Sequence, residues 1–471
     1  MIQELSITRF VTLHSLLVML GLAIYIMGSH ARRQRRHPSA AIAWVVSLAL
    51  MPYVALPLYL LVGSRKVAGH RTTLGPPALP AKPQDLDSPA LRFQHLAAAM
   101  RLPQACAYTQ LAVHQDGHQA LAALQMVMAQ ATRTLDVSTF ILGRDMLGNE
   151  VSSALIERAG AGVQVRLLID GIGVYLGGRP NIRRLSAAGV QVALFVSPLH
   201  SPLAGRTNLR NHRKMAIADG LHMWSGGRNL AAEYFLGNTN GSTREPPWID
   251  LSFDFRGPLA HEGQNQFNQD WAFATQATAP AALPKTACAT SPGQKTAQLI
   301  PSGPDQTDDT LYSLLISSCF TARNRIFAVT PYLVPDATLL MALTLAARRG
   351  VAVDLILPRR SNHRLADMAR RPALRELSQA GARIWLMPEM VHAKAVVIDD
   401  ELALAGSANL DERSMFLNYE LVVAFFAPAD VLQFADWLEH QKMTAVRHIP
   451  SEPGILREFS EGVIRWVAFQ L

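Results

Sequence analysis

Two long runs of apolar side chains open the chain, separated by a short basic segment. The runs cover residues 10–27 and 40–62, and neither contains an Asp, Glu, Lys or Arg. Each is long enough to cross a bilayer as a helix, although Pro52 and Pro57 should kink the second. A cleaved signal peptide is the alternative for the first run, but no A-x-A-type site follows it and the second run comes at once. The pattern therefore predicts an anchor of two transmembrane helices in residues 1–63.

The rest of the chain alternates between helical and strand-like segments. Residues 149–159 have the pattern of an apolar-faced helix, and residues 163–169 that of a strand buried on both faces. A second helix–strand pair ends at residues 189–192. Farther along, residues 346–357 repeat the pattern of residues 157–169. Alternating helices and buried strands predict an α/β fold built from two similar halves.

Shifts in composition mark the boundaries between these units. Residues 75–83 (GPPALPAKP) are rich in Pro, and the apolar stripe of the last residues suits either a membrane surface or a protein core. We expect two transmembrane helices in 1–63, a Pro-rich linker in 64–105, a first α/β half in 106–275, a linker in 276–296, a second half in 297–450 and a C-terminal amphipathic tail in 451–471.

One eight-residue skeleton, H-x-K-x-x-x-x-D, occurs once in each half at an offset of 180 residues. Each copy is followed at the same distance by a turn of small residues and an Asn, in the segments 226–229 and 406–409. A constant offset for both features indicates a duplicated unit. The residues of the two skeletons are His212, Lys214 and Asp219 in the first copy, and His392, Lys394 and Asp399 in the second.

The spacing within each skeleton has a physical interpretation. In a strand, residues i and i+2 lie on one face, so each His and its Lys should point the same way. Asp219 and Asp399 lie an odd number of residues from their His, which predicts structural groups at the strand ends that face away from it. A single His-x-Lys pair could equally be part of a solvent-exposed strand face. Two copies with matching turns argue against that interpretation.

Paired His and Lys side chains suit chemistry on phosphate. A neutral imidazole can attack phosphorus, and a second imidazole can protonate the leaving oxygen. Two ammonium groups can stabilise the charge on the phosphoryl oxygens in the transition state. One copy of the motif supplies half of these groups, so the two copies should meet across a pseudo-two-fold axis.

Composition narrows the class of partner. The formal charge is +8 with an isoelectric point of about 9.6, which would suit nucleic acid or anionic lipid equally well. Hydrophobic residues make up 49% of the chain and charged residues only 17%, and this balance leans toward a membrane protein. No spacing typical of a metal site accompanies the motifs. We therefore expect no metal and no cofactor, with the two Lys supplying the positive charge.

The doubled motif with the following G-G/S-x-N turn resembles the signature of the phospholipase D superfamily. The resemblance implies that the two halves pack as one pseudo-symmetric unit with the site at their seam. Within the superfamily, the chain is similar to bacterial cardiolipin synthases over nearly its whole length. The segments that carry this similarity are residues 226–234, 302–305, 330–336 and 406–414.

The resemblance also implies roles for supporting residues. Acidic residues at positions 250 and 420 match those that orient the catalytic His in the family, and we expect Asp250 to serve His212 and Glu420 to serve His392, each in its own half. Asn229 and Asn409 are expected to donate hydrogen bonds to phosphate. Ser407 supplies the hydroxyl of the second turn, where the first copy has Gly227.

The activity implied by the resemblance is phosphatidyl transfer between two phosphatidylglycerol molecules, which gives cardiolipin and glycerol through a phosphatidyl-histidine intermediate. His212 would be the nucleophile and His392 the acid and then the base, although the sequence is symmetric enough to allow the reverse. A phospholipase D or phosphodiesterase that uses water as acceptor would share the motif. Two complete His–Lys pairs argue against a non-catalytic lipid-binding protein.

The expected partners are phosphatidylglycerol and an anionic lipid bilayer, and not nucleic acid. The expected location is the bacterial inner membrane, with more than one membrane pass. Four Arg in the loop between the apolar runs face four basic residues on the flanks, so the charge bias does not decide the orientation. The motif also leaves open whether the second lipid is phosphatidylglycerol or phosphatidylethanolamine, and the sequence does not decide the oligomeric state.

Overall fold

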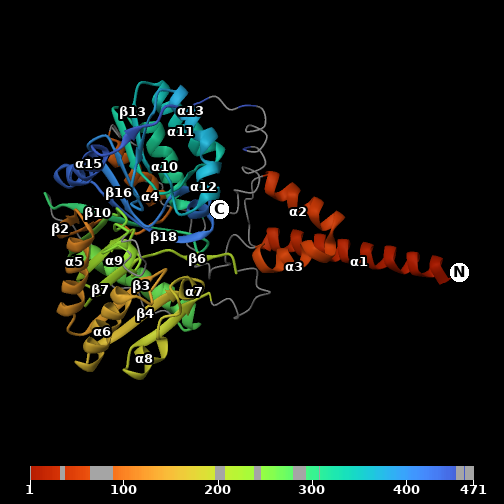
Figure 1. Ribbon diagram of the computed structural model, residues 1–471, viewed down its shortest axis with the longest axis horizontal. Coiled ribbons are helices and arrows are strands. Elements are labelled where there is room, and N and C mark those ends of the chain that lie inside the picture. Colours follow the sequence, from red (N-terminus) through yellow and green to blue (C-terminus); the bar gives the residue numbers. More distant parts are fainter. Residues whose placement is uncertain are drawn as a thin grey trace.

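Three N-terminal helices project from a large α/β body in the computed structural model (Figure 1). The structure describes residues 2–31, 38–63, 88–196, 207–237, 245–278, 293–306, 308–451, 454 and 461. Residues 64–87, 279–292 and nearly all of the predicted C-terminal tail lie outside the described residues, so the expectations for these segments are not addressed.

The N-terminal helices are α1 (Ile2–Ala31), α2 (Pro38–Leu50) and α3 (Pro52–Val62). Within α1, the stretch Val11–Gly28 has a mean hydropathy of 2.0 and could cross a membrane by length and composition. The second apolar run is not one helix, because it breaks at Met51, directly before the proline that opens α3. With 13 and 11 residues, α2 and α3 are about 20 and 17 Å long, shorter than a bilayer core of roughly 30 Å. The prediction of two transmembrane helices is therefore not confirmed.

The first half contains a seven-stranded sheet in the order β2-β9-β8-β7-β3-β4-β5. Strands β3, β4 and β5 are parallel and the others antiparallel. The strands are β2 (Thr109–His114), β3 (Thr134–Thr139), β4 (Gln164–Asp170), β5 (Gln191–Phe195), β7 (Met215–Ala218), β8 (His222–Gly226) and β9 (Ser252–Arg256). The helices are α5 (Gly117–Gln130), α6 (Met146–Gly160), α7 (Gly173–Leu176), α8 (Ile182–Ala187) and α9 (Pro258–Thr275), with a 3₁₀ turn at Ala232–Tyr234.

The second half repeats this order as β10-β18-β16-β15-β11-β13-β14, with β1 (Cys106–Ala107) and β19 (Val446–Arg447) added at the two edges. The matching order confirms the predicted duplication of an α/β unit. The main strands are β10 (Thr296–Ser302), β11 (Arg325–Val329), β13 (Ala352–Pro358), β14 (Arg383–Met387), β15 (Ala395–Ile398), β16 (Leu402–Gly406) and β18 (Asn418–Phe425), and a small separate sheet pairs β12 (Leu333–Val334) with β17 (Leu410–Asp411). The helices are α10 (Thr310–Thr321), α11 (Ala337–Arg348), α12 (Arg364–Ala369), α13 (Arg371–Gln379), α14 (Glu412–Phe416) and α15 (Pro428–Lys442).

The two halves share one hydrophobic core. Phe253 of the first sheet packs edge-on against Phe425 of the second and Phe434 of α15, with ring centroids 5.5 and 5.9 Å apart. A short strand, β6 (Arg210–Asn211), leaves the first half and pairs in parallel with β18. Figure 1 shows the halves as the upper and lower parts of one body. Because burial is continuous across the seam, the relative position of the two motifs is set by packing.

One predicted boundary differs from the structure. Residues 89–99, placed in the linker 64–105 by composition, form α4 (Pro89–Ala99). Phe93 and Ala97 are spaced four residues apart on one face of this helix, and both are buried in the core of the second half. The next strand, β1, also joins the second sheet through β10, so the chain enters the first half only after Tyr108.

Candidate active site

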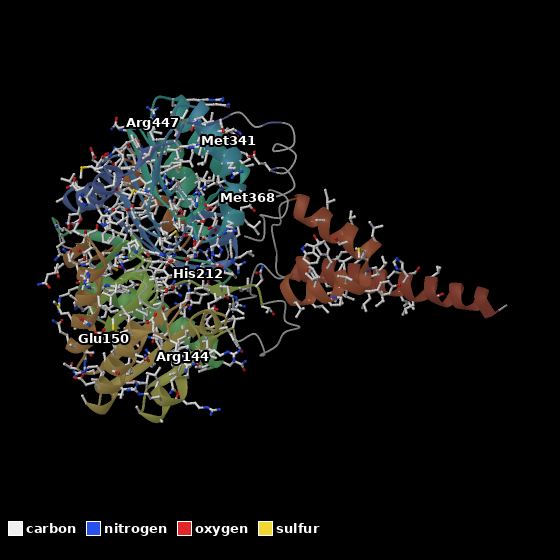
Figure 2. All side chains as sticks on the ribbon, in the orientation of Figure 1. Arg144, Glu150, His212, Met341, Met368 and Arg447 are labelled. Carbon is white, nitrogen blue, oxygen red and sulfur yellow. The ribbon has the colours of Figure 1, made fainter. Side chains whose placement is uncertain are left out.

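The two motif histidines lie at the seam, each three residues before the start of a central strand. His212 precedes β7 and His392 precedes β15, and Figure 2 labels His212 at the boundary between the halves. Each His is hydrogen-bonded through its backbone to the opposite half. The His212 N–H donates to the carbonyl of Tyr419 at 2.9 Å, and the His392 N–H donates to the carbonyl of Ile249 at 2.7 Å.

The acidic partners of the two histidines come from the opposite halves. His392 Nδ1 lies 2.7 Å from Asp250 Oδ2, and His212 Nδ1 lies 3.5 Å from Glu420 Oε1. The expectation that each acid would serve the His of its own half is therefore wrong. Sequence separation favoured the shorter connection within each half, but the fold connects the residues across the seam.

Strand order explains the exchange. Within each sheet, one strand separates the strand that follows the His from the strand that follows or contains the acid. In the first half β8 lies between β7 and β9, which follows Asp250, and in the second half β16 lies between β15 and β18, which contains Glu420. Two strand spacings separate such residues by about 10 Å. Across the seam, Tyr419 and Ile249 are hydrogen-bonded to the opposite His, and each directly precedes an acid. The acid therefore reaches the other half's imidazole.

Each Lys lies beside its own His, as the i, i+2 spacing predicts, although both His-x-Lys segments precede their strands and do not lie within them as expected. Lys214 Nζ donates to the backbone carbonyl of His212 at 2.7 Å. Lys394 Nζ donates to the carbonyl of His392 and lies 2.7 and 3.0 Å from its two ring nitrogens. Both side chains are buried. The two pairs lie close enough that Lys394 contributes to lowering the pKa of His212, and Lys214 to lowering that of Lys394.

The electrostatics of this cluster depart strongly from those of exposed side chains. Burial, reinforced by Lys214 and Arg413, holds the pKa of His212 well below its usual range. Burial and Lys394 lower the pKa of His392 to about 4, although Asp250 opposes the shift. Burial also lowers the pKa of Lys394 to about 7. Both imidazoles are therefore neutral near pH 7, the state in which an imidazole can act as a nucleophile or a base.

The acidic groups respond to the same cluster in opposite ways. Burial disfavours the charge of Asp250, but Lys394 and His392 outweigh it and hold the pKa of this carboxyl below its usual range. Burial raises the pKa of Glu420, against the opposing effect of Lys214. Asp250 is thus the more firmly ionised of the two acids.

The surroundings of the two imidazoles also differ. His392 is enclosed by Tyr234 and Trp248 of the first half, with ring centroids 5.0 and 5.7 Å away. His212 packs against Phe140 at 4.4 Å, and its Nδ1 lies 3.2 Å from the amide nitrogen of Asn418. The His212 side chain is 20% exposed and the His392 side chain 10%. His212 is therefore the more open of the two.

The turns after the motifs support the acids. Ser407 Oγ donates to Glu420 Oε2 at 2.5 Å and accepts a hydrogen bond from the Leu421 amide at 2.9 Å. In the first half, a Cβ added at Gly227 would lie 2.2 Å from Asp250 Oδ1. Gly227 thus leaves room for the shorter acid where the second half has a hydroxyl that binds the longer one.

Asn229 and Asn409 are both buried beside the site. The side chain of Asn229 bonds to Tyr234, and that of Asn409 bonds to Asp411. Among the residues that the structure describes, the Oδ1 atom of each has no hydrogen-bond partner.

Asp219 and Asp399 lie away from the imidazoles. Asp219 accepts hydrogen bonds from the backbone amides of residues 132–134, and Asp399 from those of residues 323–325. Both residues adopt left-handed backbone conformations, with φ of 54° and 51°. Each carboxylate therefore closes the turn after its motif strand onto the segment that leads into the neighbouring central strand.

Arg213, between the first His and Lys, was not singled out from the sequence. Its side chain is fully buried, pairs with Asp270 and donates to the carbonyls of Glu420 and Ser302 at 3.0 and 3.1 Å. It also contacts Asp305 at 3.1 Å. This guanidinium therefore links the first motif to Glu420, Ser302 and Asp305 of the second half. In the sequence, a charged residue between two predicted site residues was the feature that could have identified it.

Other residues missed from the sequence are Tyr234, Trp248 and Asn418, which contact the imidazoles. Trp248 and Asn418 each precede an acid by two positions, which is the spacing of neighbours on one side of an extended chain. This spacing could have identified them. Within the described ranges, no three His, Cys, Asp or Glu side chains are arranged to hold a metal ion.

Comparison with known proteins agrees with this geometry. Residues 124–271 and 315–442 match the family model described as the phospholipase D-like domain of cardiolipin synthase. Cardiolipin synthase A of Pseudomonas aeruginosa strain PAO1 is 31% identical over 451 residues, which cover 91% of each chain. Cardiolipin synthase A of Pseudomonas syringae pv. syringae is 31% identical over 85% of this chain and 86% of that protein.

The fold has a counterpart among solved structures. The phosphatidylserine synthase of Haemophilus influenzae Rd KW20 superposes with a TM-score of 0.62 at 13% identity, and covers 82% of this chain and all of that one. This likeness concerns the fold alone. With two matched domains and relatives above 30% identity over most of their length, the chain belongs to the cardiolipin synthase family of phospholipase D-like phosphatidyltransferases.

Proposed function

We propose that the protein transfers a phosphatidyl group from one phosphatidylglycerol to another, forming cardiolipin and releasing glycerol. The observation that carries the proposal is the convergence of two His–Lys pairs at one seam, each imidazole next to a carboxylate of the opposite half. Neutral imidazoles and buried ammonium groups are the parts needed for double displacement at a phosphodiester.

In the first step, a ring nitrogen of His212 attacks phosphorus, and the bond from phosphorus to the glycerol oxygen breaks. His392 gives a proton to that oxygen, and Asp250 stabilises the charge on the imidazole before the proton leaves. Lys214 and Lys394 hold the non-bridging oxygens, with Asn229 and Asn409 as further donors. The product of this step is phosphatidyl-His212 and free glycerol.

In the second step, His392, now neutral, takes the proton from a hydroxyl of the second phosphatidylglycerol. The hydroxyl oxygen attacks phosphorus, the bond from phosphorus to His212 breaks, and cardiolipin forms. The proton taken here replaces the one donated earlier, so the enzyme returns to its starting state.

The assignment of roles rests on the difference between the two imidazoles. His392 is the closer to its carboxylate, at 2.7 Å, and this suits repeated proton transfer. His212 is more open and lies farther from Glu420, at 3.5 Å, and this suits approach to a lipid phosphate. A bound phosphodiester anion would offset the charge of Lys394 and so raise the pKa of His392 toward the range of an acid.

We further propose that α1 holds the enzyme in the bacterial inner membrane, beside the anionic lipid that it uses. The stretch Val11–Gly28 is apolar and only 6% buried within the protein, which suits contact with lipid. The short helices α2 and α3 pack against α1, around a small cluster that contains Leu48, Ala55 and Leu56.

The test is the product formed by the purified full-length protein in phosphatidylglycerol micelles. We expect release of glycerol and formation of cardiolipin, at a rate that a chelator leaves nearly unchanged. Phosphatidic acid as the only product would instead establish a hydrolase that uses water as acceptor. Adding phosphatidylethanolamine with an isotopic label would show, by the mass of the product, whether it also serves as the second lipid.

A further inference from the structure

A large basic cavity lies in the second half, apart from the paired histidines. It has a volume of about 680 Å³ and is formed by the segment after β13, by α12 and α13, and by residues after β19. None of the motif residues lines it. Met368, which does line it, lies on the side of the body that faces the N-terminal helices (Figure 2). Six arginines surround the space: Arg359, Arg360, Arg364, Arg370, Arg371 and Arg375.

The acids in and around this cavity do not balance its positive charge. Asp367 Oδ1 lies 3.1 Å from Arg370 Nη2, and Glu461 pairs with Arg375 at 2.5 Å. The other four arginines form no ion pair with any residue that the structure describes. His448 lines the same space and adds no negative charge. Several positive charges around one cavity repel one another, and an anion bound between them would offset this repulsion.

Arg370 shows that the cavity is built into the protein and is not only a basic surface. Its side chain is 6% exposed, and its Nη2 donates to the Arg359 carbonyl at 3.0 Å. Its Nη1 is buried and has no hydrogen-bond partner in the described part of the chain. The buried guanidinium charge next to the cavity adds to its positive potential. Helix α13 begins at Arg371, so the positive end of its dipole adds to the same potential.

We propose that this Arg370 cavity binds a phosphate group at a second site, outside the catalytic centre. Guanidinium groups match the oxygens of a phosphate monoester or diester in geometry as well as in charge. The phosphate can come from the headgroup of an anionic phospholipid or from free inorganic phosphate. With a lipid bound, the cavity would hold the second half of the enzyme against an anionic bilayer.

A pair of matched variants tests this site in the full-length protein in neutral detergent micelles. Arg364→Ala with Arg371→Ala removes two exposed arginines of the cavity. Arg183→Ala with Arg184→Ala removes two exposed arginines of α8, in the first half. Both double variants change the net charge equally, and neither alters a residue of the catalytic site. The probes are inorganic phosphate, dihexanoylphosphatidylglycerol and, as a zwitterionic control, dihexanoylphosphatidylcholine, each titrated by calorimetry.

We expect the cavity variant to bind one phosphate-containing ligand fewer per chain, or to bind it at least about tenfold more weakly, while the α8 variant matches the unaltered protein. Loss for the lipid alone identifies a headgroup site. Loss for inorganic phosphate alone identifies a site for free phosphate, and loss for both leaves the site open to either source. Equal binding by the two variants would overturn the proposal.

Two further measurements keep the result interpretable. If the double variant unfolds, Arg364→Ala alone replaces it, because that side chain is exposed. Cardiolipin formation measured in parallel distinguishes this site from the catalytic one. Loss of inorganic phosphate binding at the cavity would stand even if the enzyme proved to be a hydrolase.

Discussion

The two histidine sites have the same backbone geometry and different chemical surroundings. Both imidazoles are fixed through a backbone hydrogen bond from the opposite half, and both lie beside a Lys two residues away. Yet His392 lies 2.7 Å from an ionised Asp250 inside an aromatic wall, whereas His212 lies 3.5 Å from Glu420 and is more exposed. The duplicated motif thus supplies the same groups twice, and the residues around the two copies differ.

The residues between His and Lys in the two motifs also have different surroundings. Arg213 in the first copy forms a fully buried connection to the second half, whereas Ala393 in the second copy is simply packed in the core. The middle position of the motif therefore holds the halves together on one side of the pseudo-two-fold axis only. Differences of this kind can be tested by changing matched positions in the two halves.

The largest effects are expected from the histidines themselves. His212→Ala and His392→Ala should each lower the rate by at least about ten-thousand-fold, because each removes a group that takes part in both steps. Only His392→Ala should regain formation of the covalent intermediate with a phosphatidyl donor that has a better leaving group, since such a donor needs no acid. The measurement is trapping of labelled phosphatidyl-enzyme. Label found on His392 and absent from His212 would reverse the assignment of roles.

The next largest effect is expected from Asp250, the acid that lies beside the histidine of the opposite half. Asp250→Asn should lower the rate by roughly a hundred- to ten-thousand-fold, as for other acids that orient a catalytic imidazole. The Asp250 charge raises the pKa of His392, so its removal should lower that pKa further and leave His212 nearly unchanged. NMR titration of the histidines in the variant measures both pKa values. A change at His212 alone would support pairing within one half and contradict the crossed arrangement.

The Arg213 link predicts a loss of stability. Arg213→Met should destabilise the body by about 3–5 kcal/mol, because it leaves Asp270 buried without its cation. Burial already raises the pKa of Asp270 to about 6 even with Arg213 present. Denaturant unfolding in micelles measures the change. Arg158→Met, at a partly exposed ion pair with Glu157, is the control and should cost no more than about 1 kcal/mol. Adding Asp270→Asn should restore part of the stability, and no recovery would argue against an unpaired charge as the cause.

The pH profile tests whether the charge of Lys394 is needed. The pKa of Lys394 is lowered to about 7, so its charge is lost as the pH rises through this value. If the charge is needed, kcat/KM should fall by about tenfold per pH unit above the pKa. Because the pKa of each imidazole lies below its usual range, no loss is expected between pH 7 and 6. Lys394→Arg should keep its charge and flatten the falling limb, and an unchanged limb would assign it to another group.

The smallest effect concerns the turn residues. Ser407→Ala removes one of the hydrogen bonds to Glu420 but leaves the bond from Asn418 at 3.2 Å, so we expect a loss of roughly fivefold in kcat/KM. Gly227→Ala should be more harmful, since the added Cβ would meet Asp250 at 2.2 Å. Steady-state kinetics of the two variants checks the order. Equal effects would show that the turns are interchangeable.

The sequence by itself determined the features that depend on local spacing. The 180-residue repeat identified the duplicated α/β unit, and the i, i+2 rule placed each Lys beside its His. The apolar run in residues 10–27 identified the helix that is long enough to cross a membrane. Each of these follows from periodicity along one segment, which the chain carries without reference to the rest of the fold.

Only the tertiary structure decided the features that depend on distant segments. Strand order put one strand between each His and the acid of its own half, and pairing of the two halves at the seam placed the acid of the opposite half beside each His. Packing of Phe93 turned part of an apparent linker into a core helix. The break at Met51 divided the second apolar run. In the first two cases the deciding contacts join residues far apart in sequence, and their energy comes from burial and hydrogen bonding across a seam that no local pattern encodes.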